Sequence, residues 1–183
     1  MKLFSTIRSS IRRAGVIDIH VPPMPDFDLN RYTGHWYEIA RLDHFFERGL
    51  ARVTANYTRR EDGKILVINR GYDPVQKCWK ENQATAIQQK PSNYFRVYFV
   101  PLIGGAYRIL GLDKDYKWAV ISGGRSDYLW FLSRMPSVSS ETWDTMVEIA
   151  RNSGYNIAEL IPVSQGAQPP SDMPENTPSH RMT

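Results

Sequence analysis

The side chains able to carry out metal, acid–base or nucleophilic chemistry are few and widely spaced in this sequence. The chain has neither a glycine-rich phosphate loop nor a nucleophile elbow. Its four histidines do not have the spacing of metal ligands: His20, His35, His44 and His180. The single cysteine, Cys78, cannot form an intramolecular disulfide, and its strand-like surroundings favour a structural role over a thiol nucleophile. We therefore predict no metal, no cofactor and no catalytic residue, although a Ser–His–Asp triad assembled in space would escape sequence reasoning.

The chemistry that the sequence favours is the binding of an apolar molecule. A two-residue alternation places aliphatic and aromatic side chains on one face of successive segments, among a few amide, hydroxyl and indole donors. This lining suits a hydrocarbon chain with a small polar head, and each buried CH₂ would contribute roughly 0.8 kcal/mol. Tyrosines at such positions can instead fill a core. The predicted ligand-binding residues are Ala55, Tyr57, Val67, Asn69, Val97, Phe99, Tyr107, Ile109, Trp118, Tyr128 and Trp130, with Val53, Phe95 and Val120 in the same phase.

Four charged residues bear on the polar end of such a ligand. Arg48, Arg52 and Lys64 are candidates for contacting a phosphate or carboxylate head, with plain solvated side chains as the alternative. Glu38 shares the strand phase of Trp36, so it is either an inward hydrogen-bonding anchor or a residue whose phase is misjudged. An inward carboxylate would need a partner or a raised pKa.

Eight short strands must position these side chains. The alternation and the turn residues predict strands over 36–42, 52–58, 65–72, 80–88, 94–100, 106–112, 117–122 and 128–134. We expect Gly63 to adopt positive φ in a hairpin turn, Gly104-Gly105 to form another turn, and residues 44–50 to form an aromatic loop that folds over an opening. With no helix between the strands, the pattern favours an up-and-down antiparallel barrel or a sandwich. The aromatic content favours the barrel, whose interior can hold one small ligand.

A single long helix follows the eighth strand. Ser139 is placed to cap it, Glu141 lies in its first turn, and Gly154 is placed to end it. An apolar stripe with helical spacing should pack on the outside of the barrel: Trp143, Met146, Val147 and Ala150. Residues 155–163 are predicted to form a last strand.

Three separated motifs resemble those of the lipocalin family, over about residues 26–163. Gly34-His35-Trp36 is similar to the Gly-x-Trp signature at the start of the family's first strand. Asp113-Lys114-Asp115-Tyr116 resembles its Thr-Asp-Tyr turn, with lysine in place of threonine. Arg134 ends the eighth strand, where the family places an arginine across the signature tryptophan. The resemblance implies an all-β, eight-stranded barrel with the helix outside and a structural floor of Gly34, Trp36 and Arg134.

Further runs, such as residues 36–41 and 127–134, are similar to the bacterial outer-membrane lipoprotein lipocalins, relatives of apolipoprotein D. That resemblance implies a protein that binds and stores or transports a fatty acid or lysophospholipid for membrane maintenance under stress, and a homodimer as one assembly. An enzyme or a haem or tetrapyrrole binder on the same barrel is the alternative. The resemblance also implies a cell-envelope location, in the outer membrane or periplasm. However, no cysteine for a lipid anchor precedes Cys78, and no clear signal peptide is present, so a cytoplasmic protein is the alternative.

The charge distribution argues against a nucleic-acid partner. The chain has 23 Lys and Arg against 19 Asp and Glu, and four of the basic residues fall in the first fifteen positions. The rest of the chain is therefore balanced, and the high pI belongs to the N-terminal arm. This arm suits either an amphipathic helix in peripheral contact with a membrane or a disordered leader. We expect a basic leader and Pro-rich linker over 1–25, a lipocalin domain over 26–164 and a disordered tail over 165–183.

Overall fold

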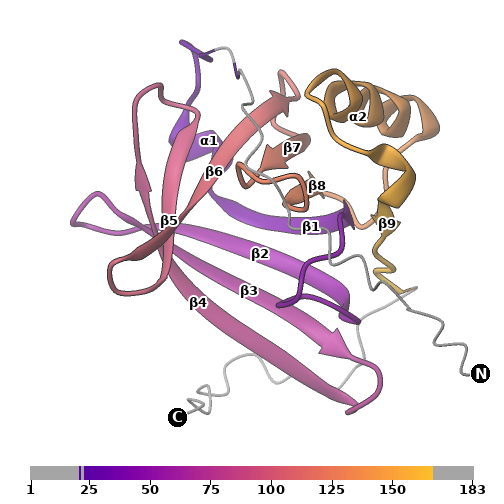
Figure 1. The fold of residues 1–183 in the computed structure, drawn as a ribbon. Helices are drawn as coiled ribbons and strands as arrows, with labels where there is room; N and C mark the ends of the chain where they lie inside the picture. The colour runs from indigo at the N-terminus through magenta and orange to yellow at the C-terminus, as the bar shows by residue number, and fades with distance from the viewer. Residues whose placement is uncertain (1–20, 22, 167–183) are drawn as a thin grey trace, which may run out of the picture.

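The computed structural model describes residue 21 and residues 23–166, and its main body is a closed barrel of eight antiparallel strands (Figure 1). Each strand pairs with its sequence neighbour, and the first pairs with both the second and the eighth, which closes the sheet. This confirms the predicted up-and-down barrel. The strands are β1 Gly34–Arg41, β2 Ala51–Arg59, β3 Ile65–Asp73, β4 Cys78–Gln88, β5 Tyr94–Val100, β6 Ile103–Leu112, β7 Trp118–Ser122 and β8 Leu129–Ser133.

Strand β1 closes the barrel by dividing its pairing between two neighbours. Its first half lies against β2, where Trp36 is opposite Ala55, and its second half lies against β8, where Glu38 is opposite Leu132. A short outer strand, β9 (Ile161–Pro162), pairs with the end of β1. The predicted last strand over 155–163 is wrong in extent: only β9 is a strand, because the Asn156 side chain caps a 3₁₀ turn, η1 (Ile157–Glu159), in the middle of this segment.

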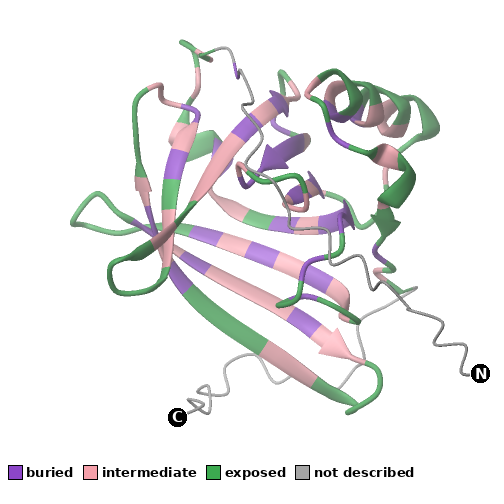
Figure 2. Ribbon diagram, viewed as in Figure 1, coloured by how far each residue is buried: buried purple, intermediate pink, exposed green. Residues whose placement is uncertain are grey.

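Buried positions recur along the barrel strands (Figure 2). Two apolar layers hold the fold together. One fills the closed end of the barrel, where a short helix, α1 (Leu29–Tyr32), enters β1. The other lies between the outer barrel wall and α2 (Ser140–Asn152), which buries Met146 and Ala150. The Ser139 side chain accepts from Thr142 N as the predicted N-cap, so the outside helix is confirmed. No helix among the described residues is long and apolar enough to cross a bilayer.

The turn before β6 is not where the glycines suggest. Gly104 and Gly105 are paired within β6, and the chain reverses at Leu102, which has a φ of 71°. A Cβ at Gly104 would lie 2.7 Å from the ring of Tyr98, so glycine here allows close packing across the strands rather than a turn. The predicted positive φ of Gly63 is confirmed at 79°.

The phase predicted for the seventh strand is also wrong. In β7, Ile121 lies opposite Trp130 of β8, and directly opposed residues project from the same face of a sheet. Ile121 therefore faces inward with Trp130, while Trp118 and Val120 face outward into the layer under α2. Because α2 covers this part of the barrel, both faces of β7 are apolar and the sequence gives no alternation from which to choose.

The ends of the predicted domain are only partly described. The basic arm and most of the predicted tail lie outside the described residues. Two residues before position 26 pack on the barrel: Val21 joins the layer under α2, and Met24 packs against the inner layer. At the other end, the Gln165 side chain donates to the backbone oxygens of Glu38 and Val53.

Candidate ligand-binding cavity

A cavity of about 520 Å³ occupies the open half of the barrel. Its wall includes most of the ligand-binding residues predicted from the sequence, which alternate inward along their strands: Ala55, Tyr57, Val67, Asn69, Val97, Phe99, Tyr107, Tyr128 and Trp130. This volume lies within the range of roughly 300–1,000 Å³ typical of small-molecule pockets. The lining is mainly apolar and aromatic, so the cavity can take up a hydrocarbon chain.

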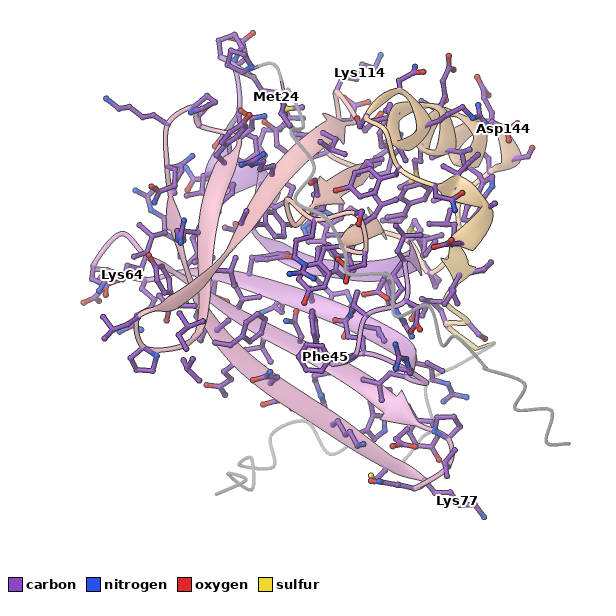
Figure 3. All side chains as sticks on the ribbon, in the orientation of Figure 1. Met24, Phe45, Lys64, Lys77, Lys114 and Asp144 are labelled. Atoms are coloured by element: carbon purple, nitrogen blue, oxygen red, sulfur yellow. The ribbon has the colours of Figure 1, made fainter. Side chains whose placement is uncertain are left out.

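Two predicted ligand residues and the three predicted head-group cations lie elsewhere. Ile109 faces inward but is wholly buried in the core at the closed end, and Trp118 packs under α2. The exposed side chain of Arg48 pairs with Asp43 at 2.9 Å. Arg52 lies over the ring of Tyr72 on β3, and Lys64 lies in the β2–β3 turn, at the opposite end of β2 from the β1–β2 loop (Figure 3). None of the three cations lines the cavity.

Several wall residues escaped the sequence prediction. Asn82 of β4 is opposite Asn69 of β3 and shares its inward face, a relation visible only once the hairpin register is known. The sequence predicts a turn at Gly105 and makes no prediction for Ile103, whereas the structure places both in β6, on the wall. The loop residues Phe45, Phe46 and Glu47 also line the cavity, as do Val100, Gly104, Ala106 and Leu132. Figure 3 shows Phe45 on the β1–β2 loop, consistent with the aromatic loop expected over the opening.

The closed end is built around Arg134 and Trp36. The guanidinium carbon of Arg134 lies 3.8 Å from the centre of the Trp36 ring, within cation–π range. Its nitrogens also donate to backbone oxygens of α1 and its flanks, including those of Tyr32 at 3.1 Å and His35 at 2.7 Å. Gly34 has a φ of 94°, and a Cβ there would lie 3.4 Å from Arg134 Nη1. The structure thus brings together the three residues of the predicted floor.

A buried polar cluster joins the β1–β2 loop to the cavity wall. Glu38 lines the cavity and accepts from Arg41 Nη1 at 2.8 Å. The other terminal nitrogen of Arg41 donates to the backbone oxygens of Glu47 and Leu50, which ties the loop to β1. The Glu47 carboxylate accepts from Trp130 Nε1 at 3.0 Å and lies 3.0 Å from His44 Nε2. The inward orientation of Glu38, left open by the sequence, is therefore settled.

The two carboxyl groups of this cluster are shifted in opposite directions. Burial, together with the nearby charge of Glu47, raises the pKa of Glu38 well above its usual range. Burial opposes ionisation of Glu47 as well, but the close approach of the His44 imidazole, the hydrogen bond donated by Trp130 and the charge of Arg41 lower its pKa overall. The cavity wall therefore carries one carboxyl group whose pKa is raised beside one whose pKa is lowered.

A chain of tyrosine hydroxyls lies deeper, between the cavity and the floor. Tyr107 on β6 is hydrogen-bonded to Tyr57 on β2, with 3.0 Å between the oxygens, and also to Tyr32 at the end of α1. The ring of Tyr32 packs on Trp36 at 5.1 Å. Burial raises the pKa of all three phenols, so each stays protonated. Within residue 21 and residues 23–166, no cluster of three or more His, Cys, Asp or Glu side chains could hold a metal ion.

Sequence comparison identifies the family of this barrel. Residues 27–165 match the family described as lipocalin-like domain. The outer membrane lipoprotein Blc of Vibrio cholerae is 43% identical over 148 residues, covering 79% of this chain and 86% of that protein. Its namesake in Escherichia coli K12 is 41% identical over 143 residues, covering 76% of this chain and 80% of that protein. Mouse apolipoprotein D is 30% identical, covering 81% of this chain and 82% of that protein. None of these three names is that of an enzyme.

Solved structures share the fold at much lower identity. Lobster apocrustacyanin A1 superposes with a TM-score of 0.66 at 14% identity, covering 79% of this chain and 83% of that one. Insecticyanin from the tobacco hornworm Manduca sexta superposes with a TM-score of 0.65 at 16% identity, covering 81% and 86%. The closed barrel, the outer helix and a family match across almost all of the described residues lead to one conclusion: the chain belongs to the lipocalin family.

Proposed function

We propose that the protein binds a fatty acid or lysophospholipid in the barrel cavity, and stores or transports it for membrane maintenance without catalysing a reaction. The observation that carries this proposal is the cavity of about 520 Å³ with its apolar wall. Ten buried methylenes would supply roughly 8 kcal/mol before the costs of association are subtracted. A Kd of 1 μM itself corresponds to about 8 kcal/mol, so micromolar binding requires more than ten buried methylenes, as in a hexadecanoyl chain, or further contacts with the wall.

The cell envelope is the proposed location. The relatives with more than 40% identity are named outer membrane lipoproteins, and their similarity covers most of both chains. Fractionating the native cells, followed by mass spectrometry of the mature protein, would give the compartment and the native N-terminus. Recovery of the protein in the cytoplasm alone would contradict this part of the proposal.

The ligand proposal is tested by filling the cavity. Val67 faces into the cavity, and the preceding residue, Leu66, faces the other side of β3. V67W and L66W therefore add the same side chain to opposite faces of the strand. Delipidated protein would be titrated with hexadecanoic acid and hexadecanoyl lysophosphatidylcholine while tryptophan fluorescence is followed, because Trp130 lines the cavity. We expect wild type and L66W to bind with micromolar affinity and V67W to lose at least tenfold, with melting temperatures checked for all three. No response of the wild-type protein to several such lipids would overturn the proposal.

Two proposed partners, a second copy of the chain and a membrane surface, can be distinguished experimentally through the exposed apolar residues near the opening. Phe45 is 77% exposed, Leu102 96% and Ile103 73%. A homodimer formed through this rim would double the apparent mass on a sizing column, and F45S would return it to a monomer. Peripheral membrane contact would instead appear as co-sedimentation of the monomer with lipid vesicles. Deleting the N-terminal arm would then show whether that arm supplies the contact.

A further inference from the structure

The tyrosine chain at the base of the cavity contains one more donor than it uses. Tyr32, Tyr107 and Tyr57 are joined by two hydrogen bonds, with Tyr107 in the middle. A phenol has one O–H to donate and can accept as well. Whichever hydroxyl is the donor in each of the two hydrogen bonds, together they use two of the three hydroxyl protons. Among the described residues these hydroxyls make no other hydrogen bond, so one O–H is left over.

The unused donor can be presented to the cavity. Tyr57 and Tyr107 both line the large cavity, whereas Tyr32 lines only a separate void of about 10 Å³. That void is too small to hold more than one water molecule. If the chain runs from Tyr32 through Tyr107 to Tyr57, the last proton belongs to Tyr57 at the cavity wall. A chain of hydrogen bonds polarises its members, which strengthens the terminal donor.

The charges around the chain select the kind of acceptor. None of the residues that line the cavity is a Lys, Arg or His that could pair with an anion, and Glu47 on the same wall would repel one. The two nearby guanidinium groups are already engaged, since Arg41 pairs with Glu38 and Arg134 donates to several backbone oxygens at the floor. A charged carboxylate or phosphate is therefore disfavoured at the base, and an uncharged oxygen is favoured.

We propose that Tyr57 and Tyr107 form a subsite that donates one hydrogen bond to an uncharged oxygen at the inner end of a single-chain lipid. The ligand class is then a fatty alcohol, a long-chain ketone or aldehyde, or a fatty acid in its neutral form, inserted oxygen first. A lysophospholipid enters by its tail and brings only a methyl group to the base. This inference rests on the proposed function and deepens it by naming the orientation and the recognised group.

The test compares two ligands with the same chain in a double variant. Y57F/Y107F removes both cavity-facing hydroxyls, whereas either single change leaves a free O–H on the other tyrosine. Y155F is the matched control, because it also removes a buried phenol hydroxyl, one that is hydrogen-bonded to Ser122 in the outer layer and does not line the cavity. Dodecanol and dodecanoyl lysophosphatidylcholine would each displace a fluorescent apolar probe, N-phenylnaphthylamine. We expect the double variant to bind dodecanol about fivefold more weakly, as for one neutral hydrogen bond, and the lysophospholipid within about twofold of wild type. Y155F should leave both affinities unchanged.

Equal weakening of both ligands, or no weakening of dodecanol, would overturn the subsite while leaving the lipid-binding proposal in place. Failure of both ligands to bind the wild-type protein would defeat the proposed function itself. A second measurement needs no variant and so does not depend on its folding. The infrared carbonyl band of bound dodecanone should lie at lower frequency than in hexane, because a hydrogen bond weakens the C=O bond. A band at the hexane position would overturn the inference.

Discussion

Replacing Arg134 by methionine should destabilise the barrel by about 3 kcal/mol. Its guanidinium lies 3.8 Å from the centre of the Trp36 ring and donates to five backbone oxygens, those of Arg31, Tyr32, Thr33, His35 and Tyr116. A hydrogen bond to a charged group contributes about 1.5–3 kcal/mol, and a cation–π contact about 0.5–2 kcal/mol. The sum of all these contacts would be an overestimate, because one side chain makes them and water can replace several at this partly exposed site.

The assay is urea unfolding followed by tryptophan fluorescence, with thermal melting as a second probe. For a domain of this size, about 3 kcal/mol corresponds to a fall in Tm of roughly 10 °C. R134K keeps the charge but not the planar array of donors, and should lose about half as much. The matched control is R125M, because Arg125 also lies over an aromatic ring, that of Tyr128 at 5.2 Å, but pairs only with the adjacent surface residue Asp127. We expect R125M to change stability by less than about 0.5 kcal/mol. If R134M and R125M unfold at the same urea concentration, the floor does not stabilise the barrel as argued.

Three further predictions concern the wall and the outer layer. In E38Q, the free energy of unfolding relative to wild type should increase as pH rises from about 5 to 8, as measured by urea titrations. The reason is that burial raises the pKa of Glu38. Its protonated form stabilises the wild-type fold at low pH, and this contribution is lost as pH rises through the folded pKa. E47Q should show the opposite trend and in a lower window: because the pKa of Glu47 is lowered, the stability that E47Q loses relative to wild type is constant above about pH 5 and shrinks as pH falls below it. Parallel curves for the two variants would contradict this assignment. W118A should lower the Tm by several degrees yet leave lipid affinity unchanged below the transition, since Trp118 packs under α2; a tenfold affinity loss would place it on the cavity. G123A should cost about 1–3 kcal/mol in urea unfolding, because its Cβ would lie 2.6 Å from Tyr128 Cβ, and a wild-type midpoint would show that the strands adjust freely.

The sequence determined the eight strands and their inward faces because these strands are amphipathic over most of their length, while the aromatic content and the motif resemblance favoured a barrel over a sandwich. Alternation at Val67 and Asn69 on β3, or Val97 and Phe99 on β5, identifies an inward face without any knowledge of the neighbours. The capped helix after the eighth strand was equally readable, since Ser139 and the apolar stripe act within one element. The contact between Trp36 and Arg134 was predicted from motif resemblance instead, because these residues are brought together only when the barrel closes.

Tertiary structure decided whatever depends on a neighbouring strand or on the outer helix. Trp118 faces outward because β7 pairs with β8 in one particular register, and the helix covering it removes the polar face that alternation needs. Asn82 joins the wall only through its pairing with Asn69. The hydrogen-bonded tyrosines come from α1, β2 and β6, and no spacing along the chain relates them. The sequence by itself therefore determined the container and most of its apolar lining, while closure of the barrel decided where its polar groups meet.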